Sequence, residues 1–457
     1  MDKYDVIVAG AGPAGGIAAY FAAKHGLKVL LIEEKPKEKV GHKTCGDAVG
    51  HHHFERIGYP PPTKPPELER VVKGIDVYSP DRETVFRVAS PELQGYIIDR
   101  PSFGQRRLKM ALNAGAEFLD KTRVIEPIFD NGYVIGVKAK TASGIKEFYA
   151  KVTIDATGMV ATLRKYVPDS WGIEKNILPE DSIIAYREIR DIEKHVDEPE
   201  YQRIYLSQEL APGGYTWVFF KRDLEDGRIR VNVGLGISMS LKMNPKQVFY
   251  DKIIKWDLFE NSKLVHGAGA PVTVRRPIDT LVGNGFMVVG DAASAANPVH
   301  GGGIGSSMLS GKLAAETIVE ALEIGDVSQK GLWQYNIKYN EQYGAKQASL
   351  DVFRIFLQTL KDTDLNYGMR AKLITEQDLL KANLGEDLRL NITEKAKRLL
   401  RGWRKLNLLN DLRYVAEKMK EAKKLYLNYP SSPADFNKWK KDKDRLFKEV
   451  KAKFWSK

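Results

Sequence analysis

Residues 4–15 read YDVIVAGAGPAG, an apolar segment that runs directly into a glycine-rich turn. The first six of these residues are mostly apolar and β-branched, which predicts a buried parallel strand. An alanine-rich helix up to about Lys24 and a second strand over residues 28–32 are expected to follow. Strand, glycine turn, helix and strand make half of a βαβ unit, so this stretch predicts a Rossmann-type α/β domain that binds a dinucleotide.

The glycines of this turn have separate roles. Gly10 permits the tight turn, Gly12 lets a pyrophosphate approach the backbone, and Gly15 allows the helix to pack closely on the strand. The helix N-terminus then faces the phosphates. Glu33 ends the second strand, 18 residues after Gly15, where its carboxylate can accept a hydrogen bond from a ribose hydroxyl. The turn predicts a dinucleotide without distinguishing FAD from NAD.

Two motifs far along the chain make that distinction. Residues 290–293 read GDAA after a predicted strand over 286–289, and residues 297–305 read NPVHGGGIG. Asp291 can bind ribityl or pyrophosphate oxygens. The glycines open a helix whose first N–H groups can face the N1/O2 edge of a flavin, where a positive dipole end stabilises the anionic reduced form. These motifs favour FAD.

Together with residues 155–158 (DATG), the motifs resemble those of the p-hydroxybenzoate hydroxylase superfamily of FAD proteins, over roughly residues 1–320. The resemblance implies further FAD contacts from Arg100, which begins an Arg-x-x-Phe pattern, and from the backbone of Val124 near the adenine. The residues expected to contact FAD are Gly10, Gly12, Ala14, Gly15, Glu33, Cys45, Gly46, Asp47, Arg100, Val124, Gly158, Asp291, Gly303 and Ile304.

Two further segments resemble the geranylgeranyl reductase branch of that superfamily. Residues 43–47 (KTCGD) match a Cys-Gly element that lies beside the isoalloxazine ring in this branch. Residues 215–219 (YTWVF) are similar to its Tyr-x-Trp-x-Phe-Pro substrate motif, although Phe220 stands in place of the proline. The resemblance implies an enzyme that reduces isoprenoid chains, such as those of archaeal ether lipids or of chlorophyll. A basic C-terminal segment and the lack of a transit-peptide-like start favour the archaeal lipid type.

The aromatic motif suits such a substrate. On a strand, Tyr215, Trp217 and Phe219 project to one face because side chains alternate. They are therefore expected to line a groove for a polyprenyl chain, as substrate pockets are mostly apolar. Taken without the family context, the same stripe is more often ordinary core between two sheets.

The expected reaction is hydride transfer from flavin N5 to an alkene that is protonated as the hydride arrives. Cys45 and His300 are the candidate catalytic residues. The alternative for Cys45 is an inert buried cysteine, and the alternative for His300 is a histidine that only stabilises the backbone of its turn. The three consecutive histidines at 51–53 cannot easily converge on one ion, so no metal is predicted. No second dinucleotide fingerprint occurs, so the electron donor is expected to be NADPH, ferredoxin or another reductant that docks transiently.

The predicted strands suggest how the chain is divided. Longer strands of mixed polarity over 182–190, 203–208, 215–221 and 228–237 predict an antiparallel sheet inserted into the nucleotide domain. The segments expected to form a discontinuous FAD-binding domain are 1–75, 95–165 and 265–330. The segments expected to form the substrate-binding domain are 76–94 and 166–264, followed by a helical, basic C-terminal domain over 331–457.

Charge is concentrated at the C-terminus. From Lys395 onward there are 20 Lys and Arg against 7 Asp and Glu, whereas the preceding residues carry 51 against 52. This balance suggests a polyanionic partner or a solvated helical surface. An apolar stripe accompanies the charge, formed by Leu399, Leu400, Trp403, Leu406, Leu409 and Leu412. The stripe predicts either an interfacial helix on an anionic membrane or a helix that packs on the body and closes the substrate tunnel.

The remaining composition is that of an ordinary globular protein, with 43% hydrophobic residues and a single cysteine. One cysteine fits a reducing cytoplasm, where peripheral contact with the inner face of the membrane is expected. The apolar run over 6–23 is explained by the glycine turn and not by a membrane span. The fold pattern starts at Tyr4, so no signal peptide is expected.

Three other functions are compatible with parts of the sequence. A flavin-dependent aromatic or quinone monooxygenase would use the same FAD motifs. A carrier of prenylated proteins that has lost FAD is disfavoured by the intact glycines, Asp291 and Arg100. Flavin-dependent RNA methylation would explain the basic tail, but no RNA-binding motif is recognisable, so nucleic acid is not an expected partner.

Overall fold

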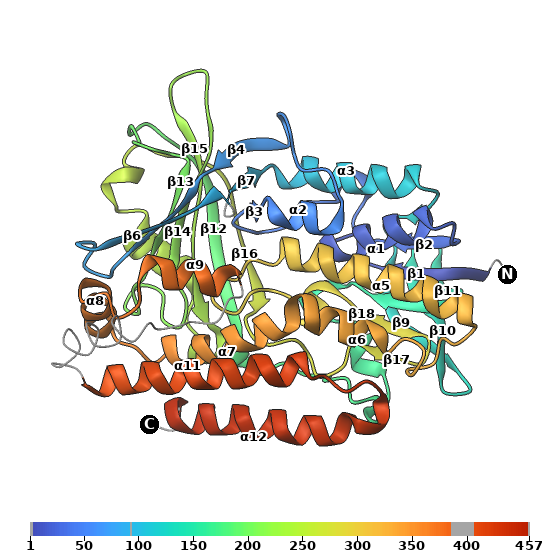
Figure 1. Cartoon of the computed structure of the whole chain (residues 1–457). Helices are drawn as coiled ribbons and strands as arrows, with labels where there is room; N and C mark the ends of the chain where they lie inside the picture. Colours follow the sequence, from blue (N-terminus) through green and yellow to red (C-terminus); the bar gives the residue numbers. More distant parts are fainter. Residues whose placement is uncertain (1–2, 92–93, 385–405, 456–457) are drawn as a thin grey trace.

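The first sheet carries the predicted nucleotide-binding unit. The computed structural model describes residues 3–91, 94–384 and 406–455 (Figure 1). The eight-stranded sheet has the path β17-β18-β11-β1-β2-β8, and β10 and β9 continue from β11. Its strands are β1 (Lys3–Ala9), β2 (Val29–Ile32), β8 (Glu117–Leu119), β9 (Arg123–Asp130), β10 (Tyr133–Thr141), β11 (Gly144–Asp155), β17 (Val282–Gly283) and β18 (Phe286–Val288). The strands from β18 to β8 are parallel, so the predicted Rossmann-type fold is confirmed.

Helices α1 (Pro13–Lys24), α3 (Arg100–Asn113) and α5 (Ile304–Ile324) pack side by side over one face of this sheet (Figure 1). The glycine turn between β1 and α1 packs closely on itself and on the end of β11. A Cβ on Gly15 would lie 1.9 Å from the Gly10 carbonyl oxygen, and one on Gly10 would lie 2.4 Å from that of Ala156. The φ of Gly10 is also +107°, which L side chains rarely adopt. Neither glycine can be replaced without moving backbone.

The second sheet has seven strands in the order β16-β12-β15-β14-β13-β5-β6, antiparallel except for the β13–β5 pair. Its strands are β5 (Gly74–Tyr78), β6 (Val85–Ala89), β12 (Ser182–Ile192), β13 (Tyr201–Tyr205), β14 (Thr216–Asp223), β15 (Ile229–Ser238) and β16 (Lys263–Thr273). The four predicted strands correspond to β12–β15. The expected domain boundary at residue 264 falls inside β16, which pairs with β12, so the second sheet extends further along the chain than the sequence indicated.

A small third sheet and short helices connect the two large sheets. Strands β3 (Ala48–Gly50), β7 (Gly95–Ile98) and β4 (Leu68–Val72) form that sheet, and helix α2 (His52–Ile57) follows β3 in the chain. Helix α4 (Pro245–Val248) lies between β15 and β16 in the chain. The chain is then helical, as predicted. These helices are α6 (Gln334–Tyr339), α7 (Ala345–Leu357), α8 (Asp362–Arg370), α9 (Glu376–Leu384), α11 (Leu406–Leu427) and α12 (Phe436–Trp455).

The two C-terminal helices lie against the body of the protein. α11 runs along α7, and α12 contacts both (Figure 1). Leu409 is buried and Leu412 is half-buried against the main core, so this part of the apolar stripe packs inward. Leu399, Leu400 and Trp403 of the predicted stripe lie outside the described residues. Among the described helices, none has the length and apolar character that a membrane span requires.

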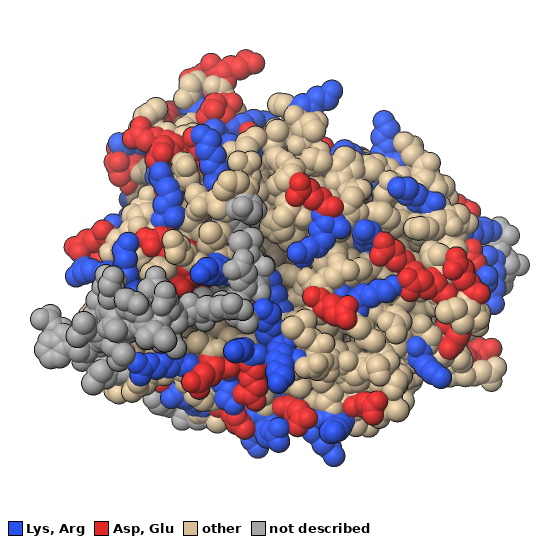
Figure 2. All heavy atoms as spheres, in the orientation of Figure 1, with Lys and Arg blue, Asp and Glu red and all other residues tan. Residues whose placement is uncertain are grey.

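Several basic side chains of α12 neutralise buried carboxylates of the body. Lys443 Nζ lies 2.6 Å from Asp279 Oδ1, and both side chains are almost fully buried. Lys451 Nζ lies 3.5 Å from Asp181 Oδ1, which also accepts a 2.8 Å hydrogen bond from Arg354. On the face drawn in Figure 2, basic and acidic groups are interspersed. Part of the positive C-terminal charge therefore holds the fold together.

This ion network predicts a specific acid sensitivity. Burial alone would raise the pKa of Asp181, but the charges of Arg354, Arg275 and Lys451 outweigh it and lower the pKa to about 2, from 3.8. A lowered folded-state pKa stabilises the fold above pH 4, and the contribution is lost as the pH falls from about 4 to about 2. We expect the free energy of unfolding to fall by about 2 kcal/mol over this range because of Asp181.

Denaturant unfolding at several pH values between 2 and 5 measures this loss. The Asp181→Asn variant should be less stable at pH 6 and should lose less stability on acidification than the wild type. Asp169→Asn is the matched control, because Asp169 is exposed and forms a surface ion pair with Lys175. An unchanged pH profile in Asp181→Asn would contradict the assignment.

Candidate active site

One cavity of about 610 Å³ joins the glycine turn of the first sheet to the face of the second sheet and to the C-terminal helices. Its first part is lined by backbone of the two glycine-rich segments and by the loop over residues 43–47. Its second part is lined by apolar side chains. The main apolar lining residues are Val72, Ile75, Val77, Phe86, Val88, Ile183, Ile204, Val272, Val274, Leu350, Phe353, Leu357, Leu365, Met369, Leu373, Leu408 and Leu412.

The first part has the groups that a dinucleotide phosphate needs. A Cβ on Gly12 would meet no atom within 4 Å, so the backbone there is open to a ligand. Arg100 is 4% exposed, and its Nε and Nη1 atoms have no hydrogen-bond partner among the described residues. The N-termini of α1 and α5 have no side-chain cap, which leaves N–H groups for an anion. The residues present fit the pyrophosphate and flavin of FAD.

The acidic residues near this part are engaged with the protein. Glu33 Oε2 accepts a 2.8 Å hydrogen bond from the Ala11 N–H, so its carboxylate lies beside the glycine turn. Asp291 Oδ2 lies 2.5 Å from Lys43 Nζ, which ties the 43–47 loop to the turn over residues 290–293. Val124 is buried in β9, two residues after Thr122, whose N–H donates to the Glu33 carbonyl. The adenine contact of Val124 stays a prediction.

The remaining predicted FAD contacts surround the same space. Ala14, Gly46, Gly158, Gly303 and Ile304 line the cavity. Gly158 has φ +73°, and a Cβ there would meet no atom within 4 Å. Gly303 is the residue before α5, and its Cβ position lies 3.3 Å from Asp291 Oδ1. These placements support the predicted contacts.

The open space at Gly12 leads to a prediction. We expect Gly12→Ala to weaken FAD binding by about ten-fold or more, because its methyl group would occupy the backbone approach to the pyrophosphate. The stability of the FAD-free protein should hardly change, because the Cβ would contact nothing. Fluorescence titration of FAD and thermal unfolding of the FAD-free protein measure the two effects. Equal FAD affinity in the variant would place the pyrophosphate elsewhere.

The 43–47 loop is held on the second sheet by a buried polar network. Asn232, in β15, is fully buried and donates from Nδ2 to the Cys45 carbonyl (2.7 Å) and to Asp47 Oδ2 (2.8 Å). Its Oδ1 accepts from Trp217 Nε1 at 3.0 Å. Lys221 Nζ donates to the same Asp47 carboxylate at 2.9 Å. The Oδ2 atom of Asp47 thus anchors the loop, and the predicted contact of Asp47 with FAD stays a prediction.

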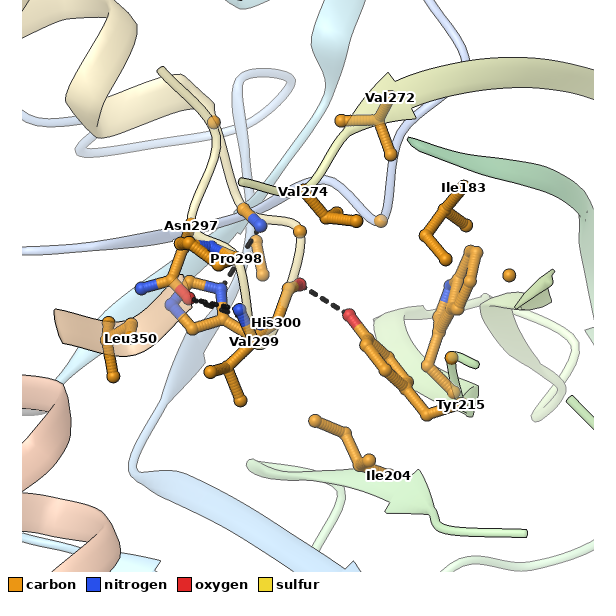
Figure 3. Close-up of a pocket in the computed structure, with 18 of the residues that line it drawn as sticks. Ile183, Ile204, Tyr215, Val272, Val274, Asn297, Pro298, Val299, His300 and Leu350 are labelled. Carbon is orange, nitrogen blue, oxygen red and sulfur yellow. Dashed lines mark hydrogen bonds between the residues drawn. The ribbon is translucent and has the colours of Figure 1, made fainter. Parts of the chain in front are cut away.

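The aromatic motif faces the cavity, as its alternation predicts. Ring centroids of Tyr215 and Trp217 are 6.0 Å apart, and those of Trp217 and Phe219 are 6.4 Å apart. The Tyr215 hydroxyl donates a 2.5 Å hydrogen bond to the His300 carbonyl (Figure 3). This bond connects the second sheet to the turn before α5. The three rings therefore form one wall of the cavity beside the flavin-binding segments.

The histidines near the cavity are neutral groups at pH 7. Burial, with a contribution from Lys346, lowers the pKa of His300 to about 4, and burial also lowers the pKa of His52 to about 4. His300 Nδ1 accepts from the Gly302 N–H at 3.1 Å, so the ring stabilises its own turn. The His53 ring packs on Gly305, where a Cβ would lie 2.1 Å away. Among the described residues, no cluster of His, Cys, Asp or Glu could hold a metal ion.

Sequence reasoning missed several residues of the cavity. Asn232 and Lys221 are polar residues at buried strand positions, a signal that indicates a network but not its partners. Arg187 is another, on β12, where Ile183 and Ala185 also line the cavity. The contribution of α7 was also missed. Lys346, Leu350, Phe353 and Leu357 recur at helical spacing and line the cavity, but the same pattern is typical of core packing.

Comparisons with known proteins agree with this geometry. Residues 181–272 match the family described as the geranylgeranyl reductase catalytic domain, and residues 5–165 match the FAD dependent oxidoreductase family. The chain is 43% identical to a digeranylgeranylglycerophospholipid reductase of Sulfolobus acidocaldarius, over 98% of both chains. The chain belongs to the digeranylgeranylglycerophospholipid reductase family. A relative of the same name from Methanothrix thermoacetophila is 32% identical over 87% of this chain and 98% of its own.

Membership of this reductase family makes the protein a flavin-dependent oxidoreductase with FAD as its cofactor. Among solved structures, a geranylgeranyl bacteriochlorophyll reductase-like protein from Thermoplasma acidophilum superposes with a TM-score of 0.77. It is 27% identical and covers 91% of this chain and 100% of its own. A flavin-dependent brominase, 20% identical, has a TM-score of 0.66 over 89% of this chain and 99% of its own, and shares the fold. The predicted family and cofactor are confirmed.

Proposed function

We propose that this protein uses reduced FAD to hydrogenate carbon–carbon double bonds in the geranylgeranyl chains of isoprenoid ether lipids. The observation that carries the proposal is the cavity that joins the FAD-binding segments to a space lined mainly by aromatic and aliphatic side chains. An isoprenoid chain offers apolar shape and weak π density but no charge along its length. Such a space recognises it by contact and excludes water.

The cofactor, the apolar walls and the buried polar residues make different contributions to the proposed reaction. Reduced FAD supplies hydride from its N5 atom. The apolar walls exclude water, and Tyr215, Trp217 and Phe219 present aromatic faces that tolerate positive charge as it builds on the tertiary carbon. Asn232 and Asp47 hold the Cys45 loop against the sheet that carries Trp217. These contacts support a rigid binding position for the alkene.

The alkene also needs a proton. The Cys45 thiol is the proposed source, since Cys45 lines the cavity in the loop beside the flavin-binding segments. His300 is less suited to this role, because its lowered pKa leaves the ring neutral at pH 7 and its Nδ1 atom is engaged in its own turn. Its contacts support positioning of the turn before α5 and of Tyr215.

We further propose two partners. The family needs a reductant, which we expect to be NADPH, ferredoxin or another donor that docks transiently. A peripheral contact with the inner face of an anionic membrane would deliver the lipid. The outward lysines of α11 and α12 support that contact. They are Lys420, Lys424, Lys438, Lys441 and Lys448.

An anaerobic half-reaction tests the reductase. The purified protein is reduced with dithionite, a geranylgeranyl lipid is added, and flavin absorbance and product mass are followed together. We expect the flavin to reoxidise while the product gains two hydrogens for each reduced bond. A flavin that stays reduced until oxygen is admitted would favour the monooxygenase, and a protein purified without FAD would favour a carrier.

A further inference from the structure

Arg187 is a buried cation in the wall of the cavity. It lies on β12, is 6% exposed, and lines the cavity together with Ile183 and Ala185 of the same strand. The only hydrogen bond of its side chain among the described residues joins Nη1 to His266 Nδ1 at 3.0 Å, and its Nε atom is buried without a partner. No described carboxylate lies within ion-pair distance of its guanidinium.

Three other buried arginines of the protein pair with carboxylates. Arg354 contacts Asp181 and Asp351, Arg275 contacts Glu174, and Arg276 contacts Asp351. A buried charge without a counter-ion is costly, because desolvation is not offset by attraction. Arg100, the other cavity-lining arginine with unpartnered nitrogen atoms, lies where the FAD pyrophosphate is expected. Because Arg187 is also buried without a described counter-ion, its guanidinium should face an anionic group when a ligand fills the cavity.

The position of Arg187 indicates how a bound anionic ligand would lie in the cavity. A Cβ on Gly234 would lie 2.5 Å from Trp217 Cζ2 and 2.6 Å from Arg187 Cβ, so the indole and Arg187 stand on either side of that glycine. His266 is exposed on the edge strand β16, whose residues 263–267 face solvent. Arg187 thus spans from the aromatic wall to the outer edge of the sheet. A ligand held there would have its charged end near solvent and its chain over Trp217.

We propose that Arg187, assisted by His266, binds the phosphoryl group of an isoprenoid phosphate ester or phospholipid. This inference rests on the proposed function. The planar guanidinium can offer two parallel N–H donors to phosphate oxygens, a geometry that suits phosphate better than a hydroxyl group. The phosphoryl contact fixes the head of the lipid and thereby limits which double bonds reach the reacting position.

The test compares two probes that differ only in the anion, geranylgeranyl phosphate and geranylgeraniol. With the wild-type holoenzyme we expect a KM for the phosphate at least about ten-fold below that for the alcohol. Arg187→Met should raise the KM for the phosphate to that of the alcohol, while the KM for the alcohol stays unchanged. Arg187→Lys should keep part of the preference. Arg203→Met is the matched control, because Arg203 stacks on Phe220 in the same sheet and does not line the cavity.

Several outcomes would overturn the inference. One is an Arg187→Met variant that loses activity equally on both probes, or that changes FAD affinity or the flavin spectrum. Another is inorganic phosphate that binds the wild type but not the variant in calorimetry while the KM ratio is unchanged, which would assign the site to free phosphate. If neither probe is reduced by the wild type, the proposed function fails. Calorimetric binding of both probes to wild type and Arg187→Met then still tests the anion site.

Discussion

Replacing Asn232 with leucine is expected to lower kcat by about one hundred-fold, with a smaller effect on FAD affinity. Leucine has a similar volume, but it removes the hydrogen bonds to the Cys45 carbonyl, Asp47 and Trp217 Nε1. The loop beside the flavin and the aromatic wall would no longer share a fixed anchor. Displacement of a reacting group by about 1 Å can cost this much in rate.

Stability should also fall, by about 3 kcal/mol, because the Trp217 N–H and the Asp47 carboxylate lose buried partners. Trp217→Phe is the matched control, since it breaks only the bond from the indole and keeps an aromatic ring in the wall. We expect a kcat between those of the wild type and Asn232→Leu. Single-turnover reduction of a geranylgeranyl lipid, with flavin absorbance to confirm full FAD occupancy, measures the effect. A folded, FAD-loaded Asn232→Leu variant with wild-type kcat would show that the network is not needed for positioning.

Replacing Lys443 with methionine is expected to lower the free energy of unfolding by about 3–5 kcal/mol. The Lys443 ammonium and the Asp279 carboxylate are each no more than 1% exposed and lie 2.6 Å apart. Removing the cation leaves a buried carboxylate with too little compensating charge. α12 would lose its anchor on the body, and α12 also contacts α11, which carries the cavity-lining Leu408 and Leu412.

Lys440 provides the matched control, because it lies 3.5 Å from the same carboxylate but is 38% exposed. Lys440→Met should cost less than about 1 kcal/mol. Changing both members of the buried pair, in Asp279→Leu with Lys443→Met, should recover much of the stability, since no lone charge stays buried. Denaturant unfolding measures all three, and limited proteolysis reports release of α12. A loss from Lys443→Met no larger than that from Lys440→Met would contradict the buried anchor.

The fold of the first sheet could be predicted because its signals are local. The glycine turn at residues 10–15, the acidic end of β2 and the helix entry at residues 303–304 each constrain a few consecutive residues. Local spacing also predicted the three aromatic rings on one face. The boundary of the second sheet at β16 was misplaced, because pairing of β16 with β12 is a contact between residues about 80 positions apart in the chain.

The basic tail shows where sequence reasoning stops. Its charge predicted a polyanionic partner or a solvated surface. The number of lysines cannot distinguish these two arrangements from a third, in which lysines pair with buried carboxylates of the same protein. In the structure, Lys443 and Lys451 face Asp279 and Asp181 of the body. Whether a lysine meets a membrane, water or a buried carboxylate depends on the residue opposite, which lies far away in the sequence.

By itself the sequence determined the FAD-binding unit, the family and the alternation of the three aromatic side chains, since the motifs that indicate them each span a few consecutive residues. Only the tertiary structure decided that Asn232 joins Trp217 to the Cys45 loop and that α7 and α11 complete the cavity. It alone also showed that Arg187 is a buried cation without a carboxylate among the described residues. The physical reason is that burial and pairing are properties of the space around a side chain, and distant segments create that space when they pack.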